Sequence, residues 1–531
     1  MKMIRIVCTV IVFCLVLSVV ACQKDDTANP EEDSDDITVE FLLTAWHNTP
    51  VPDDGGKNLY KAFVDNKFGI DFIYSTTSDL QTEIVKRYSS NSFSKPDVII
   101  FSSADFARMK NLYDQGFFVE DYTGLLESMP TYKAGFDNNP NAMIKLTENG
   151  KLIALTQPAE EETWGFKIRQ DWIDKYAGGK MPTTPDELLT MARAVKAENN
   201  KLYLFTSAGM GDSLGSINNL QYMYGPNGFY INDNTVAHPL LNGDRKKFLD
   251  FVKTLYDEGL IYPDWFTQSW ENKKSALYTD RIGIDWYCAE IATEAVYMNG
   301  GDESKAEPWV CMPMPKDPDS PLGGQSTPVS TINRFVVITK ECASNTAKLE
   351  KVLKLLDDGL YPNETYFVFR WGVDVDNYNI DDEIIPVPDV NGGNSGFFAY
   401  FTNKNKDTHL RSIHLGYIDY GAYSSTRSDN YIEYYDVDEN NVVYSTQKFI
   451  ELRKGVSEQL KTNPSINYSE ILNINPRLDT QLTQMQLEFE INYIIGVKSD
   501  YDGFVSEWKT AGGDTVIAAA TQQFKNAGLI E

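Results

Sequence analysis

Histidine is scarce, and two well-known catalytic motifs are missing. The chain has four histidines among 531 residues. It contains neither His-Glu-x-x-His nor Gly-x-x-x-x-Gly-Lys-Ser/Thr, so zinc-protease and P-loop nucleotidase chemistry are not indicated. Glycoside hydrolysis needs only two carboxylates that flank the scissile bond. Because the chain has 76 acidic residues, that class stays open.

Basic residues are also few. Lysine and arginine total 48, which leaves a formal net charge of −28 at pH 7. A strongly acidic protein is repelled by nucleic acid and by anionic lipid. The balance therefore argues against binding to either as the main activity, and no nucleic-acid partner is expected.

Six cysteines are present, and three of them lie in the first 22 residues. The other three are an odd number without the spacing of metal ligands. We expect them to be buried as small hydrophobic side chains, although the sequence leaves one disulfide among them open. They are Cys288, Cys311 and Cys342.

Only one long hydrophobic run is present, and it lies at the amino end. Ile6 to Val20 is nearly all apolar, follows Lys2 and Arg5, and is short for a membrane span. It leads into Val-Val-Ala-Cys22, which resembles the lipobox of bacterial lipoproteins. We predict a signal peptide over residues 1–21. An ordinary cleavage site with a chance cysteine is the alternative.

The lipobox resemblance implies that Cys22 carries two acyl chains, which are enough for stable anchoring. Residues 23–36 have no large apolar side chain, and seven of the fourteen are acidic. Such a segment buries too little surface to fold. We therefore expect residues 22–36 to be the lipidated cysteine and a solvated tether at the extracytoplasmic face of the cell membrane.

Strand and helix patterns alternate in the next part of the chain. Four apolar stretches predict strands at Ile37–Ala45, Ile70–Tyr74, Pro96–Phe101 and Gly150–Leu155, and helical periodicity separates them. This order predicts a largely parallel, doubly wound sheet, on which ligands bind at the carboxyl ends of strands. The candidate ligand-binding residues at those ends are Trp46, His47, Asn48, Ser102 and Asp105.

A second set of elements starts at residue 163. Trp164, Phe166 and Ile168 alternate as in a strand, and Arg169 stands where a helix begins. Arg281–Ile284 predicts another strand that ends at Asp285 and Trp286. Further elements are a capping box at Thr184–Glu187, a strand or crossing at Phe367–Gly372 with Arg370 and Trp371, and a mainly helical tail over Thr446–Glu531.

Together these segments resemble a known family. They are the Cys22 lipobox, Trp164–Lys175, Pro182–Leu188, Asp257–Asp264, and a C-terminal pattern from Ile495 to Gly513. The chain is similar to the lipid-anchored family 1 extracellular solute-binding proteins of carbohydrate ABC importers, in particular the long branch associated with complex oligosaccharides.

The resemblance implies an α/β, two-lobed periplasmic-binding-protein-like fold of the class II type. Each lobe is a sheet flanked by helices, and the C-terminus is an extended helical segment. We expect residues 37–158 plus 325–371 to form lobe 1 and residues 159–324 plus 372–531 to form lobe 2. The chain would cross between lobes near Gln157–Thr163, Gly323–Thr331 and Trp371–Asp376.

The resemblance also implies a function. The chain would be a monomeric binding protein, not an enzyme, that captures an oligosaccharide between its lobes and delivers it to membrane permease subunits. No cofactor is expected. Some relatives carry a calcium loop after the capped helix, but Lys196–Tyr203 lacks the alternating carboxylates and the glycine, so we predict no metal there. The alternatives are a glycan-active surface enzyme and a glycan-docking lipoprotein outside transport.

Sugar recognition uses aromatic faces and polar edges. Trp46, Trp286 and Trp371 are the candidate platforms, although each could equally be a core residue. Arg169 could bond hydroxyls or an acidic sugar, or could simply pair with Asp171 or Glu162. The candidate site residues also include Trp164, Asp285 and Arg370, whereas we expect Trp172 to pack in the core. The sequence does not identify the sugar.

Overall fold

The fold was analysed in a computed structural model. It describes residues 37–44, 59–77, 79–89, 93–102, 105–137, 139–158, 164–328, 332–360, 363, 365, 444–462, 466 and 468–531. Several predictions fall outside these residues: the signal peptide, the lipidated Cys22 with its tether, and the site residues Trp46, His47, Asn48, Arg370 and Trp371.

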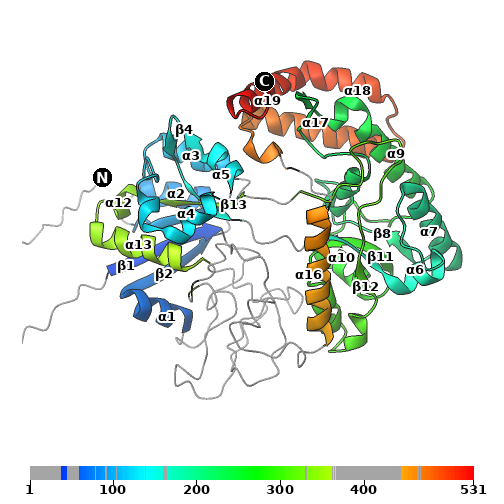
Figure 1. Cartoon of the computed structure of the whole chain (residues 1–531), viewed down its shortest axis with the longest axis horizontal. Helices are drawn as coiled ribbons and strands as arrows, with labels where there is room; N and C mark the ends of the chain where they lie inside the picture. The colour runs from blue at the N-terminus through cyan, green and yellow to red at the C-terminus, as the bar shows by residue number, and fades with distance from the viewer. Residues whose placement is uncertain are drawn as a thin grey trace, which may run out of the picture. The chain divides into compact units, whose positions relative to one another are not determined.

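The first sheet has five strands in the order β2-β1-β3-β13-β6. The strand β1 pairs in parallel with β2 and β3, while β13 runs antiparallel between β3 and β6. Figure 1 shows these strands with helices on both sides. The strands are β1 (Ile37–Thr44), β2 (Ile70–Thr77), β3 (Val98–Ser102), β6 (Leu155–Pro158) and β13 (Ile332–Ile338).

One strand prediction for this sheet was wrong in detail. The stretch Gly150–Leu155 is not a single strand of the sheet. Its first part, β5 (Lys151–Leu152), pairs with β4 (Thr147–Glu148) in a two-stranded hairpin, and Leu155 begins β6. The apolar run therefore covers the end of a turn and the start of the edge strand β6. Nothing in its local sequence indicates that β6 pairs with β13, which lies nearly 180 residues later.

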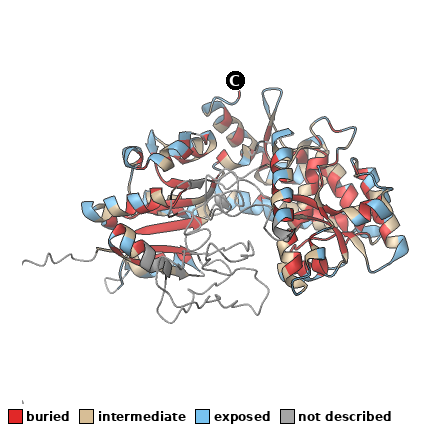
Figure 2. Ribbon diagram, turned by 60° about the horizontal axis from the view of Figure 1, so that its bottom comes forward, coloured by how far each residue is buried: buried red, intermediate tan, exposed pale blue. Residues whose placement is uncertain are grey.

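Helices pack against this first sheet because their apolar faces need burial. Figure 2 shows the sheet strands as buried and the outer helix faces as exposed. The core draws its side chains from residues 39–155 and 332–360. The helices are α1 (Leu59–Phe68), α2 (Leu80–Ser89), α3 (Phe106–Asp114), η3 (Leu125–Ser128), α4 (Pro130–Asp137), α5 (Pro140–Leu146), α12 (Lys340–Ala343) and α13 (Thr346–Asp358).

The second sheet has four strands in the order β12-β7-β11-β8. The central pair, β7 and β11, is antiparallel, and β11 runs parallel to β8. The carboxyl ends of β8 and β11 therefore lie at the same sheet edge as the start of β7. The strands are β7 (Gly165–Arg169), β8 (Tyr203–Phe205), β11 (Ile282–Tyr287) and β12 (Trp309–Cys311).

The capping box is confirmed with one difference. Thr184 caps α7 (Pro185–Glu198) by accepting from the Glu187 backbone N–H, while the Glu187 carboxylate accepts from the backbone N–H of Thr183. The other elements around this sheet are α6 (Gln170–Tyr176), η4 (Gly215–Met223), β9 (Tyr230–Asn232), β10 (Thr235–Ala237), α8 (Pro239–Asn242), α9 (Asp244–Asp257), α10 (Trp270–Tyr278), α11 (Ile291–Met298) and η5 (Glu303–Lys305).

The tail is helical, as its pattern predicts, and it joins the second core. A buried ion pair of 2.6 Å between Arg245 on α9 and Glu490 on α17 fastens it. None of the helices among the described residues is long and apolar enough to cross a membrane. The tail consists of α16 (Tyr444–Thr462), η8 (Tyr468–Ile471), α17 (Pro476–Ile494), α18 (Tyr501–Trp508), η9 (Lys509–Gly513) and α19 (Asp514–Asn526).

The three cysteines beyond the first 22 residues are buried or half-buried in the structure. Cys288, Cys311 and Cys342 are free thiols, so no disulfide joins them. Cys342 is buried in the first core, and Cys311 and Cys288 are half-buried beside a third group of buried side chains around Trp309. Trp172 is 6% exposed and lies in the second core, which confirms its expected packing role.

We predict that Gly283→Ala destabilises the second lobe through Trp172. An added Cβ at Gly283 would lie 2.3 Å from a carbon of the Trp172 ring and 3.0 Å from Leu204. Overpacking of this kind costs about 1–3 kcal/mol, measured as the free energy of unfolding in urea. Gly124→Ala is the control, because its Cβ would meet nothing within 4 Å. Equal stabilities of the two variants would contradict the packing argument.

A second prediction concerns acid stability. The His238 ring stacks on Trp508, its Nδ1 accepts from the Leu240 backbone N–H, and burial lowers its pKa to about 3. Below pH 6.5 the unfolded chain takes up this proton first, so stability falls as pH falls. By pH 5 this residue should lower the free energy of unfolding by about 2 kcal/mol.

The variant His238→Asn keeps a capping acceptor and removes the titration. Urea unfolding at pH 7.5 and pH 5 should therefore give a smaller drop in stability for the variant than for the native protein. An identical pH dependence of the two proteins would show that His238 is not protonated on unfolding.

Candidate functional site

An aromatic cluster lies at the edge where β7 starts and β11 ends. We define it as Trp164, Trp270, Trp286 and Tyr287. The Trp164 ring centroid lies 4.8 Å from that of Trp286 and 6.0 Å from that of Trp270, and Trp270 stacks on Tyr287 at 5.4 Å. The three tryptophans are half-buried and Tyr287 is buried. The cluster is thus a continuous aromatic surface with partly accessible rings.

Strand register explains why residues so distant in sequence meet. Trp286 on β11 is opposite Phe166 on β7, and Tyr287 is opposite Gly165, so Trp164 emerges beside both. Gly165 lies close to α16, because a Cβ there would be 3.3 Å from a methyl carbon of Val456. Trp270 is added by α10, whose first turn is capped by the Ser269 hydroxyl.

A buried ion pair lies behind the cluster. Lys273 Nζ is 2.7 Å from Asp285 Oδ2, and both side chains are 0% exposed. The same ammonium group is 4.1 Å from the centroid of Trp270 and 5.4 Å from that of Tyr287. Burial raises the pKa of Asp285 and lowers the pKa of Lys273, while their mutual attraction opposes both shifts. Asp285 is therefore not exposed for direct ligand contact, contrary to its prediction as a binding residue.

A second polar group fixes Tyr287 from the far side. The Glu294 carboxylate on α11 accepts hydrogen bonds from the hydroxyls of Tyr287, at 2.8 Å, and Tyr278, and it pairs with Lys274 at 3.0 Å. Burial and this carboxylate raise the pKa of Tyr287 well above its usual value, so the hydroxyl stays protonated. The ring of Tyr287 is consequently held at both its face and its hydroxyl.

The loop after β8 completes this sheet edge. It folds back on itself, because the Ser207 hydroxyl donates to the Leu214 carbonyl and accepts from the Ile217 N–H. Gly209 and Gly215 have no room for a Cβ, which would approach backbone atoms within 2.7 Å. Between Gly209 and Gly211, Met210 adopts φ of 51° and is 63% exposed.

Besides Lys273 Nζ and Asp285 Oδ2, which face each other in the ion pair, the buried polar atoms without a hydrogen-bond partner among the described residues include three neutral ones from β11, η4 and the segment before α10. They are the indole N–H of Trp286, the amide oxygen of Asn218 and the amide oxygen of Gln268. An unsatisfied buried polar atom costs about 1–3 kcal/mol. One of these atoms is a donor and two are acceptors, which are the groups that the hydroxyls of a ligand would satisfy.

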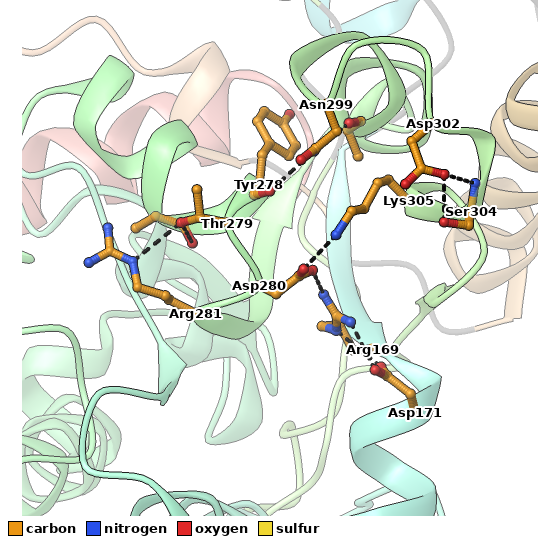
Figure 3. Close-up of polar contacts among 12 residues, drawn as sticks. Arg169, Asp171, Tyr278, Thr279, Asp280, Arg281, Asn299, Asp302, Ser304 and Lys305 are labelled. Carbon is orange, nitrogen blue, oxygen red and sulfur yellow. Dashed lines mark hydrogen bonds and ion pairs between the residues drawn. The ribbon is translucent and has the colours of Figure 1, made fainter.

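Arg169 lies at the opposite end of β7 from the aromatic cluster. Its guanidinium is bonded to Asp171, at 2.8 Å, and to Asp280, which Lys305 also contacts at 2.7 Å (Figure 3). Burial would raise the pKa of Asp280, but the bonds from Lys305 and Arg169 outweigh it and lower the pKa. The pairing alternative for Arg169 is therefore what the structure contains, and its prediction as a ligand contact has no support from this position.

Ser102 and Asp105 come together at the end of β3 in the first sheet. The Ser102 hydroxyl donates to Asp105 at 2.6 Å, and Arg108 pairs with the same carboxylate at 2.7 Å. Ser102 is half-buried and the Asp105 side chain is 19% exposed, so this small polar group is partly accessible. Whether it contacts a ligand stays a prediction, because Trp46, His47 and Asn48 are outside the described residues.

Among the described residues, no group of three or more histidine, cysteine or acidic side chains is arranged to hold a metal ion. Sequence reasoning missed Trp270, Lys273 and the loop after β8. The signals were a Ser-Trp helix start at residue 269 and a glycine-rich run, Ser207–Gly215, directly after a predicted strand. Neither reveals by itself that it reaches the same sheet edge as Trp286.

We compared the sequence and the fold of this chain with those of known proteins. No family model matches the chain. A curated relative, Lipoprotein LipO of Bacillus subtilis (strain 168), is 22% identical over 429 residues, 78% of this chain and 80% of the relative. An HMO-binding, ABC-transporter-associated solute-binding protein of Bifidobacterium longum infantis superposes with a TM-score of 0.61 at 15% identity, covering 94% of this chain and 100% of that chain.

The chain has the fold of extracellular solute-binding proteins. A further structure of this fold, the ABC-transporter substrate-binding protein FusA of S.pneumoniae in complex with kestose, has a TM-score of 0.60 at 15% identity and covers 93% of this chain and 99% of that chain. The expected two-lobed α/β architecture with a helical C-terminus is therefore confirmed. The resemblance seen in the sequence holds at the level of the fold.

We predict that Arg169→Gln acts on stability and not on ligand binding. The Arg169 side chain is 10% exposed, and its removal leaves Asp171 without its partner and Asp280 with Lys305 alone. Because those partners reach water, the loss should be about 1–3 kcal/mol, below that of a fully buried pair. Urea unfolding measures it. Arg193→Gln breaks an exposed pair with Glu258 and should cause no measurable change.

Proposed function

We propose that this protein is the substrate-binding lipoprotein of an ABC importer and that its ligand is an oligosaccharide. The observation that carries the proposal is the combination of the solute-binding-protein fold with an aromatic, partly accessible sheet edge that holds unpartnered polar atoms. The S.pneumoniae structure of the same fold contains kestose, a small oligosaccharide. Lipid attachment at Cys22 and delivery to permease subunits follow from the same proposal.

The aromatic cluster supplies the surface that a sugar ring needs. The C–H face of a pyranose or furanose packs on an indole ring, and its hydroxyls require hydrogen-bond partners once they leave water. Trp164 and Trp286 give two adjoining rings tilted by 33°. The indole N–H of Trp286 and the amide oxygen of Asn218 would then meet hydroxyls. Ser102 and Asp105 would contribute from the first lobe.

Hydrolytic activity is the competing function, because Gly211–Gly215 reads Gly-Asp-Ser-Leu-Gly and matches the Gly-x-Ser-x-Gly motif of hydrolases. A nucleophilic serine needs a histidine base within hydrogen-bond reach. Ser213 instead donates to the Gly209 carbonyl at 3.2 Å. Within the described part of the chain, the one histidine is His238, whose ring caps α8 and stacks on Trp508. Binding without turnover is therefore the better-supported function.

Isothermal titration calorimetry against neutral oligosaccharides, including kestose, tests the proposal. We expect saturable one-site binding to at least one sugar, together with a change in tryptophan fluorescence. Trp164→Ala and Trp286→Ala should each weaken affinity at least about tenfold, equivalent to about 1.4 kcal/mol, because each removes an aromatic face. Tyr256→Ala, which removes an exposed aromatic ring on α9, should leave affinity unchanged.

Recovery of the sugar after incubation separates binding from catalysis. An importer's binding protein releases the ligand with its length unaltered, and chromatography should return it quantitatively. Shortened sugars would establish glycoside hydrolysis and overturn the proposal, whether or not the Ser213→Ala variant still produced them. Full retention of affinity in both tryptophan variants would place the site elsewhere on the chain.

A further inference from the structure

The Lys273–Asp285 ion pair is unusual for its setting. Both side chains are 0% exposed, so neither can touch a ligand from this position. Removing two charges from water is expensive and rarely raises stability more than apolar packing would. A second buried pair, Arg245–Glu490, joins two helices, and Gln221 and Gln486 add further hydrogen bonds to it. Arg245 lies over Phe248, whereas Lys273 lies over rings of the aromatic cluster itself.

The contacts of Lys273 are concentrated on the aromatic cluster. Its ammonium group lies 4.1 Å from the Trp270 centroid and 5.4 Å from the Tyr287 centroid, within the range of cation–π attraction. Lys273 and Trp270 are three residues apart on α10, so they share one helix face. Asp285 directly precedes Trp286 on β11, and its other oxygen is 3.4 Å from the Ser216 hydroxyl.

The pair therefore joins the two elements that supply three of the four residues of the cluster; Trp164 comes from the start of β7. The helix α10 contributes Trp270, and the strand β11 contributes Trp286 and Tyr287. No backbone hydrogen bond can fix a helix to the face of a sheet, so side chains must set the rotation of α10. The two charges are 2.7 Å apart and both side chains are fully buried, so little solvent screens their attraction, and separating them by a rotation of α10 would leave two unpaired buried charges.

From these contacts we infer that Lys273 and Asp285 are positioning residues, which hold the rings of Trp270, Trp286 and Tyr287 in the arrangement that receives the ligand. The inference rests on the proposed function for its ligand, but the ring arrangement itself is a property of the unliganded protein. The pair would therefore affect ligand affinity through the positions of the rings, although neither side chain touches the ligand.

Near-ultraviolet circular dichroism of the unliganded protein tests the arrangement, because coupled tryptophan and tyrosine rings give a strong signal there. We expect Lys273→Met to change this near-ultraviolet signal while the far-ultraviolet spectrum, which reports secondary structure, stays native. In a Trp270→Phe background the same substitution should cause less than about half of that change. Arg245→Met is the matched control: it breaks a buried pair and should lower the unfolding midpoint while leaving the signal of the aromatic cluster intact.

The double variant Lys273→Met/Asp285→Asn guards against misfolding, since it leaves no buried charge without a partner. It should fold, lose the ring signal and bind the sugar identified by calorimetry at least about tenfold more weakly, whereas Lys273→Arg should retain part of both. A double variant with a native ring signal would overturn the inference. Absence of sugar binding by the native protein would refute the proposed function instead, and the spectra would still decide the role of the pair.

Discussion

The antiparallel pairing of β7 with β11 is the constraint on which the candidate site depends. Trp164 precedes Trp286 and Tyr287 by more than 120 positions in sequence, and the register that sets Phe166 opposite Trp286 makes it their neighbour. A slip of one residue would turn the alternate side chains of β11 to the other face of the sheet. Gly283 on β11 leaves the space that the Trp172 ring occupies, so this strand can lie against α6 only with a glycine at that position.

The same pairing separates residues that the sequence groups together. Arg169 and Trp164 are five positions apart and appear to belong to one ligand-binding segment. On an extended strand that spacing covers about 16 Å, so the two side chains reach opposite ends of the sheet. Arg169 then joins Asp171, Asp280 and Lys305 in a polar group around the turn before β11. The Arg169 guanidinium is thus paired with carboxylates of the protein and does not offer its charge to the carboxylate of an acidic sugar.

Local pattern was sufficient for most elements of the fold. The strands β1, β2, β3, β7 and β11 and the capped helix α7 follow from alternation, periodicity and the Thr184 cap. What local pattern could not provide is long-range pairing: β13 inserts beside β3, and Leu155 begins a strand that pairs with it. For the site, aromatic residues at strand ends pointed to Trp164 and Trp286. Trp270 and Lys273 were missed because a helix start carries no information about which sheet edge it faces.

Affinity in such a site depends on rings that are rigid before the ligand arrives, since each ring that must be ordered on binding costs conformational entropy. Tyr287 is fixed by Glu294 at its hydroxyl and by Trp270 at its face, and Trp270 is in turn contacted by Lys273. The charged groups next to the cluster are held in ion pairs, Lys273 with Asp285 and Lys274 with Glu294. The indole N–H of Trp286 is buried without a hydrogen-bond partner among the described residues, so a ligand hydroxyl that reached it would remove the cost of that unsatisfied donor.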